Sequence, residues 1–174
     1  MNKYKLEDFL KDVLAKHQST FKVTSYDIKN NHYLCSDTVT NPVFDFDSYV
    51  EANFEHRKLP ASPDAIYIGD KKLYFVEFKN QKAKDIDPIQ MKSKFTSGTT
   101  ILQDLLKDFT ARDNQYYFCV VHKDNETNNW YKNVEVNVPK FDLAELNDEL
   151  GGFYDKIFTR ELQFYKDNFP HLRC

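Results

Sequence analysis

Three charged side chains near the middle of the chain have the chemistry of a divalent-cation site. Asp64 is followed by twelve residues and then by Glu77, and Lys79 lies two positions further on. Carboxylate oxygens are the ligands that Mg²⁺ prefers, and a lysine beside the ion adds positive charge where water would react. They can act on one ion only if the predicted fold brings these side chains together.

Two short apolar segments, residues 64–68 and 73–79, are predicted to form a β-hairpin around a polar turn. The turn has three plausible forms. A four-residue loop at 69–72 and a two-residue turn at 70–71 give the same pairing of the strands, whereas a turn centred on 69–70 shifts it.

The first two forms of the turn set Asp64 directly opposite Glu77, and the third pairs Asp64 with Phe75 and leaves Glu77 diagonal. In every case Asp64, Glu77 and Lys79 share one face, because side chains alternate along a strand. Two facing carboxylates repel each other. Either Lys79 or a bound cation must offset this repulsion. The alternative is an ordinary solvated stripe of charges at a strand end.

The residues Pro63-Asp64 and Glu77-Phe78-Lys79 resemble the signature of the PD-(D/E)XK, or restriction-endonuclease-like, nucleases. The resemblance covers about residues 44–122. It implies an α/β fold with a mixed central sheet flanked by helices and an αβββαβ core. We treat residues 1–174 as a single domain, with a helical C-terminal extension over about 141–169.

The resemblance also implies roles for individual residues. Asp64, Glu77 and the backbone carbonyl of Phe78 would bind Mg²⁺, with Mn²⁺ as a substitute. Lys79 would orient or help to deprotonate the attacking water. Asp64, Glu77 and Lys79 would thus be the catalytic residues.

An acidic residue on the preceding helix often completes such a site. Residues 44–56 have helical spacing, with Asp47, Glu51 and Glu55 along one edge. Glu51 is our first choice for the further metal ligand because it lies in the middle of that edge. A solvated acidic stripe explains the same pattern equally well.

The segment after the motif is the most basic part of the chain and predicts a nucleic-acid contact. Its candidate residues are Gln81, Lys82, Lys84 and Gln90, and Lys92 and Lys94 follow them. Such a segment could track a phosphate backbone. An ordinary solvated loop and helix face fits as well.

The rest of the chain alternates between helical and extended patterns. Gly98-Thr99-Thr100 is expected to divide the fourth helical stretch into two. The predicted helices cover 4–17, 44–56, 88–109, 141–149 and 152–169, and the further strands cover 20–28, 115–122 and 131–138.

The composition is that of a folded protein without bulk attraction to nucleic acid. The 174 residues are 41% hydrophobic and carry 24 basic and 27 acidic side chains, a net charge of −3. Any nucleic-acid contact must therefore be local. Apolar runs are too short for a membrane span, and no signal peptide is recognisable, so we expect a cytoplasmic protein. Three cysteines at unpaired spacings predict neither a zinc site nor a disulfide, with Cys119 buried and Cys174 exposed.

These observations predict a metal-dependent nuclease that hydrolyses phosphodiester bonds, in DNA rather than RNA because the family mostly cuts DNA. The alternative is a non-catalytic module that keeps the fold and binds a protein or nucleic acid, as an immunity or regulatory partner would. The sequence leaves a homodimer open.

Overall fold

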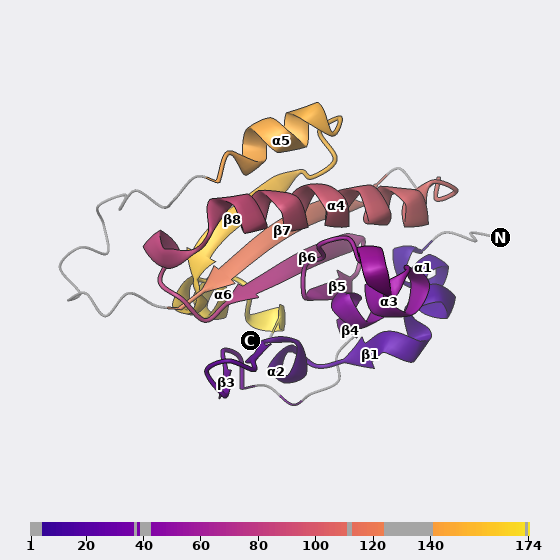
Figure 1. Ribbon diagram of the computed structural model, residues 1–174. Helices are drawn as coiled ribbons and strands as arrows, with labels where there is room; N and C mark the ends of the chain where they lie inside the picture. The colour runs from indigo at the N-terminus through magenta and orange to yellow at the C-terminus, as the bar shows by residue number, and fades with distance from the viewer. Residues whose placement is uncertain (1–4, 37, 39–42, 111–112, 124–140, 173) are drawn as a thin grey trace.

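The computed structural model describes residues 5–36, 38, 43–110, 113–123, 141–172 and 174. Six strands form one mixed sheet in the order β1-β4-β5-β6-β7-β8, and two short strands pair separately (Figure 1). The strands are β1 (Gln18–Ser19), β2 (Tyr26–Asp27), β3 (His32–Tyr33), β4 (Val43–Asp45), β5 (Ala65–Gly69), β6 (Lys72–Lys79), β7 (Gln115–His122) and β8 (Lys156–Glu161).

The predicted hairpin is confirmed as β5 and β6. Gly69 pairs with Lys72 across a two-residue turn, and Ala65 pairs with Val76. Strand β4 continues the antiparallel half of the sheet on the far side of β5, whereas β7 and β8 are parallel to β6. Central strand β6 is therefore the boundary between the antiparallel and parallel halves.

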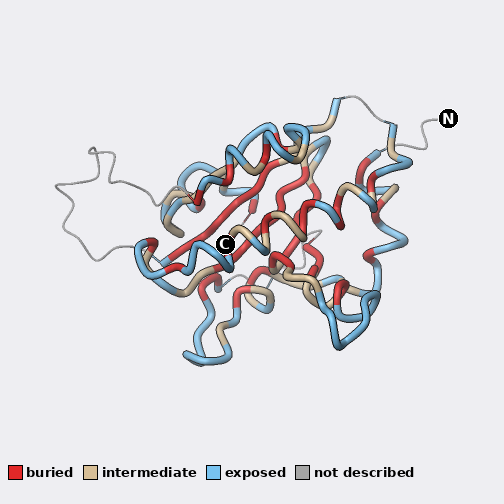
Figure 2. The backbone as a smooth tube through the Cα atoms, turned by 45° about the horizontal axis from the view of Figure 1, so that its top comes forward, coloured by how far each residue is buried: buried red, intermediate tan, exposed pale blue. Residues whose placement is uncertain are grey.

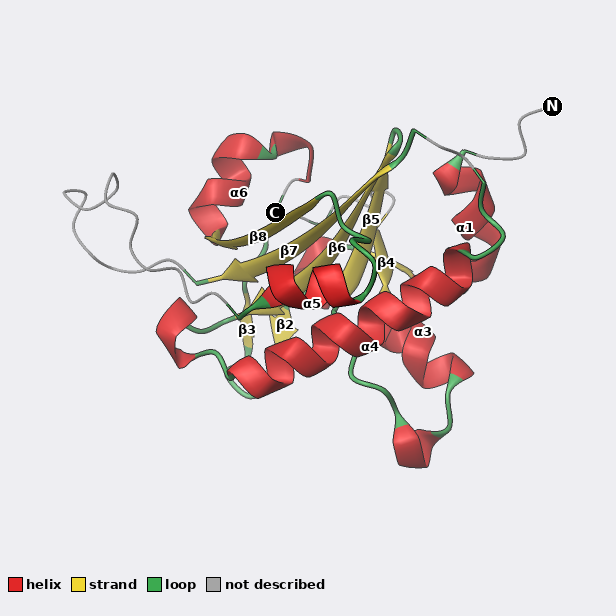
Figure 3. Cartoon of the chain, turned by 90° about the horizontal axis from the view of Figure 1, so that it is seen from above, coloured by secondary structure: helices red, strands yellow, loops and turns green. Residues whose placement is uncertain are grey.

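Helices cover both faces of the sheet. One core lies beneath α1, α3, α4 and α5, and the other beneath α2 and α6 (Figures 1 and 3). The central strands β4, β5, β6 and β7 are buried over most of their length (Figure 2). The helices are α1 (Leu6–Leu14), α2 (Phe21–Thr24), α3 (Phe46–Asn53), α4 (Pro88–Leu106), α5 (Leu143–Glu149) and α6 (Leu162–Asn168), with 3₁₀ turns at Ala15–His17, His56–Lys58, Ala83–Asp85 and Pro170–Leu172.

The strand predicted over residues 20–28 is wrong for most of its length. Thr20 caps a one-turn helix there, and its side-chain hydroxyl accepts a hydrogen bond from the backbone N–H of Val23. A threonine at this position satisfies a helix-terminal N–H group, and this local bond overrides the β propensity of the segment.

The predicted break at Gly98 is also wrong, because α4 runs without interruption from Pro88 to Leu106. Gly98 is there for packing: a Cβ atom at this position would lie 2.3 Å from Cδ of Pro63. The glycine lets the helix approach the residue that directly precedes Asp64.

The helical C-terminal extension is partly wrong. Helix α5 is confirmed, but residues 156–161 form strand β8, and α6 begins only at Leu162. Gly151, with a φ of 84°, follows the end of α5 in a conformation that favours glycine. The free edge of β7 then provides backbone partners for β8. The strand predicted over 131–138 lies outside the described residues.

The predicted absence of a disulfide is wrong as well. Cys35 and Cys174 are bonded across a sequence separation of 139, with their Cα atoms 4.8 Å apart. Cys174 is half-buried rather than exposed, whereas Cys119 is buried as predicted. Because the two cysteines are so far apart in the sequence, no short-range spacing indicates that they pair.

Within the described ranges, no helix is both long and apolar enough to cross a bilayer.

The contact between Gly98 and Pro63 generates a stability prediction. Replacing Gly98 with Ala should raise helix propensity yet destabilise the protein by about 1–3 kcal/mol, because the new methyl group overlaps the proline ring. Urea unfolding measures this change. Thr100→Ala, at an exposed position of the same helix, is the matched control and should be close to neutral. A Gly98→Ala protein as stable as wild type would contradict the packing role.

Candidate functional site

The hairpin brings Asp64 and Glu77 to one face of the sheet, where both contact the side chain of Lys94. The Lys94 Nζ atom lies 3.2 Å from Asp64 Oδ1 and 2.9 Å from Glu77 Oε2. Lys94 comes from α4, which covers this face. The sequence pattern places Lys94 only in the basic segment after the motif and predicts no role for it at the site.

Lys79 contacts the other carboxylate oxygen of Glu77. Its Nζ atom lies 2.9 Å from Glu77 Oε1 and donates a hydrogen bond of 3.0 Å to Oε1 of Gln90. Lys79, Glu77 and Asp64 thus meet on the predicted face. Gln90, proposed as a nucleic-acid contact, lies on α4 and holds the ammonium of Lys79.

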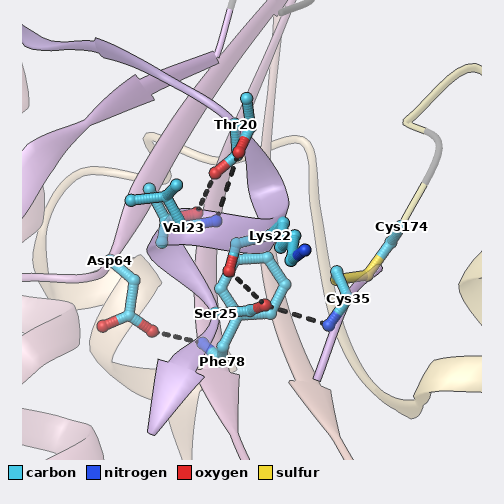
Figure 4. The surroundings of a disulfide bond; sticks show 9 residues. Thr20, Lys22, Val23, Ser25, Cys35, Asp64, Phe78 and Cys174 are labelled. Carbon is cyan, nitrogen blue, oxygen red and sulfur yellow. Dashed lines mark hydrogen bonds between the residues drawn. A yellow bond between two sulfur atoms is a disulfide. The ribbon is translucent and has the colours of Figure 1, made fainter. Parts of the chain in front are cut away.

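The other oxygen of Asp64 is held by the backbone of β6. Asp64 Oδ2 accepts a hydrogen bond of 2.5 Å from the backbone N–H of Phe78 (Figure 4). The ring of Phe78 points to the opposite face, where it packs edge-on against Phe21. The bond orients the Asp64 carboxylate toward Glu77. The ligand role of the Phe78 carbonyl stays a prediction.

Glu77 is fully buried, and this burial controls its protonation. Desolvation, followed by the nearby charge of Asp64, raises the pKa of Glu77 from 4.5 to about 7, although Lys94 and Lys79 oppose the shift. Burial alone would lower the pKa of Lys94, but the charges of Asp64, Glu77 and Asp47 outweigh it and raise that pKa above its ordinary value. Lys94 is therefore an ammonium at neutral pH.

The acid of α3 that lies nearest the site is Asp47 rather than Glu51. Desolvation and the charge of Asp64 raise the pKa of Asp47 to about 6, while Lys94 lowers it. The hydroxyl of Ser62 donates a hydrogen bond to Asp47 Oδ1. Glu51 is exposed on α3, and Glu55, which follows the end of this helix, is exposed as well. Asp47 comes closer to the site because the helix begins, not ends, beside Asp64: the Phe46 N–H donates to the Asp64 carbonyl. The ligand role of Glu51 stays a prediction.

The remaining nucleic-acid candidates lie on the surface next to the site. Gln81 and Lys84 are exposed and Lys82 is half-buried. These residues precede α4, which Asp87 caps by accepting hydrogen bonds from the backbone N–H groups of Ile89 and Gln90. The segment therefore leads from the catalytic candidate Lys79 directly into the helix that carries Lys94.

The donor atoms suit Mg²⁺, although no cluster of three or more His, Cys, Asp or Glu side chains in the described segments is arranged to hold a metal ion. Mg²⁺ commonly needs only one or two carboxylates from the protein and completes its shell with water and phosphate oxygens. Asp64 and Glu77 can provide these two. In addition, Glu77 Oε1 is buried and forms an ion pair with the ammonium of Lys79.

Comparison of this chain with models of protein families, with curated proteins and with solved structures finds no match. What the site does must therefore be argued from its own side chains.

The raised pKa of Glu77 generates a pH prediction. Because the folded state holds this proton more tightly than the unfolded chain, the proton stabilises the fold below pH 4.5, and this contribution disappears as pH rises through about 7. Glu77→Gln should remove this dependence. As pH increases between these values, the free energy of unfolding of the variant should therefore rise relative to that of wild type, by about 1–3 kcal/mol.

Urea unfolding of both proteins across this pH range measures the difference. Glu145→Gln, which replaces an exposed glutamate of α5, is the matched control. Parallel stability curves for wild type and Glu77→Gln would show that the Glu77 carboxyl does not titrate in this range.

Proposed function

We propose that this protein is a Mg²⁺-dependent nuclease of the PD-(D/E)XK type that hydrolyses phosphodiester bonds in DNA. One observation carries the proposal: Asp64 Oδ1, directly before β5, and Glu77 Oε2, on β6, both contact the same ammonium nitrogen. Two carboxylates that converge on one cation are suited to hold a divalent ion. Lys79 lies beside them, as the motif requires.

The arrangement of elements supports the same proposal. Antiparallel strands β4, β5 and β6 are followed by α4 and then by β7, parallel to β6. With α1 as its first helix, this succession agrees with an αβββαβ core. Elements β1, α2, β2 and β3 are inserted between α1 and β4, and α3 is inserted between β4 and β5. The motif residues lie at the start of β5 and the end of β6.

Asp64 and Glu77 would hold the cation, with Asp47 nearby as a third acid. Bound there, Mg²⁺ would supply positive charge to the phosphate and acidify water. Lys79, held by Gln90, positions an ammonium where it orients the attacking water and stabilises charge on the phosphate. The Phe78 N–H keeps the Asp64 carboxylate in place during this step.

Nucleic acid would approach over the segment between β6 and α4. Lys82, Lys84 and Gln81 lie there at the edge of the site, so a phosphate backbone that reaches Lys79 would pass them. The net charge of −3 is no obstacle, since these contacts are local. A cytoplasmic location remains part of this proposal, although disulfides such as Cys35–Cys174 are more common in oxidising compartments.

A non-catalytic binding module is the second candidate, and one observation favours it. Lys94 lies between Asp64 and Glu77 and neutralises them without a metal ion. If this ion pair were permanent, the site would be a structural charge cluster. Metal titration separates the two candidates, since a structural cluster would not bind Mn²⁺ at millimolar concentration.

Substitutions of Asp64 and Lys79 should have different effects on metal binding and cleavage. Asp64→Asn should lose both, because a ligand is gone. Lys79→Ala should still bind Mn²⁺, while cleavage should fall by roughly 10²–10⁴, the range for a positioned proton-transfer group. Calorimetric Mn²⁺ titration and cleavage of linear, circular and single-stranded DNA and of RNA, with EDTA as the blank, test this expectation. If Lys79→Ala cuts as fast as wild type, Lys79 is not catalytic.

Asp47 and Glu51 form a matched pair on the same helix. Asp47→Asn should weaken Mn²⁺ binding by roughly tenfold, because one nearby negative charge is removed from a poorly solvated site. Glu51→Gln should leave binding unchanged, since Glu51 is exposed. The measurement is again calorimetric. A larger effect from Glu51→Gln would return Glu51 to the site.

A further inference from the structure

Lys94 occupies the position that a cation would take between the two carboxylates. Its Nζ atom contacts one oxygen of Asp64 and one of Glu77, and its side chain is 16% exposed. Among the described residues, Lys94 is the one ammonium that contacts both carboxylates. Lys79 contacts only Glu77, and through the other oxygen.

We propose that Lys94 and a divalent cation exchange for the same two carboxylates, so that Lys94 fills the metal position of the free protein and withdraws when the ion binds. This inference rests on the proposed function. It assigns to Lys94 a positioning role: it keeps the carboxylates in a geometry ready for the ion and sets the metal concentration at which the site fills.

Charge balance favours the exchange when all the carboxylates are ionised, as metal binding requires of its ligands. With Lys94 in place, two ammonium groups already balance Asp64 and Glu77, and a dication added to them would leave an excess of positive charge even with Asp47 ionised. With Lys94 withdrawn, three carboxylates face one dication and the ammonium of Lys79, and the charges cancel. In a poorly solvated site this difference is decisive.

Distances lead to the same conclusion. Mg²⁺ binds oxygens at about 2.0–2.1 Å, so an ion that bridges Asp64 and Glu77 needs the volume now filled by the ammonium, which lies 3.2 and 2.9 Å from their oxygens. The flexible four-carbon stem of a lysine allows Nζ to leave while α4 stays in place. Gly98, one turn further along, keeps the helix against Pro63.

The test is calorimetric titration with Mn²⁺ alone, without nucleic acid, of wild type, Lys94→Gln and Lys92→Gln. Lys94→Gln keeps a hydrogen-bond donor but removes the competing charge, so it should bind Mn²⁺ at least about tenfold more tightly than wild type. Lys92 is on the same helix but pairs with Asp142 at the surface, so Lys92→Gln should bind as wild type does.

Thermal unfolding provides a second readout. Without metal, Lys94→Gln should unfold at a lower temperature than wild type, because the carboxylates lose their counter-ion. Its stabilisation by Mn²⁺ should be larger than that of wild type. Unchanged or weaker Mn²⁺ binding by Lys94→Gln, with wild type still binding, would overturn the exchange and leave the proposed function intact. Absence of Mn²⁺ binding in both proteins would overturn both.

A crystal of the wild-type protein soaked in Mn²⁺ gives the answer even if Lys94→Gln fails to fold. Anomalous density between Asp64 and Glu77, with Lys94 Nζ withdrawn from both oxygens, supports the exchange. An ion bound to these carboxylates while Lys94 still contacts both would refute it.

Discussion

The buried carboxylate of Glu77 is the constraint on which the rest of the site depends. It lies on the central strand, between β5 and β7, with a fully buried side chain. An isolated ionised carboxylate there would be strongly unfavourable, so Glu77 must either keep its proton or have positive charge beside it. Lys79 arrives along the same strand, and Lys94 arrives from the helix above. Because α4 carries Lys94, the position of this helix determines whether a second ammonium reaches Glu77.

That position also depends on a steric detail next to the charged site. Gly98 allows α4 to touch Pro63, and Pro63 directly precedes Asp64. Lys94 lies about one turn earlier on the same helix, so the close contact and the ion pairs with Asp64 and Glu77 set the helix together. Packing and charge balance therefore select the same arrangement, which is how a lysine comes to lie between two acids.

Local patterns predicted the hairpin part of the site well. A short turn and the alternation of side chains are enough to set Asp64 beside Glu77 and Lys79 on one face. Lys94 could not be found in this way, because the rotation of α4 about its axis depends on contacts with Glu77, Asp64 and Pro63, which are distant in the sequence. The spacing of Gln90 and Lys94, four apart on one helical face, was the available signal.

Other parts of the fold were ambiguous in principle. The apolar residues of 153–158 fit a helix as well as a strand, and the free edge of β7 decided between them. Asp47 and Glu51 also share one edge of α3, and only the direction in which the helix leaves Asp64 distinguishes them. In both cases a tertiary neighbour determined what the local sequence left open.

The bond between Cys35 and Cys174 closes a covalent ring that contains β4 to β8 and every residue of the candidate site. A single cleavage of the backbone anywhere between these cysteines would open the ring without separating the two pieces. A nicked molecule would therefore keep its full mass until the disulfide is reduced. The sheet could thus retain all its strands after such a cut, held by a connection outside the polypeptide backbone.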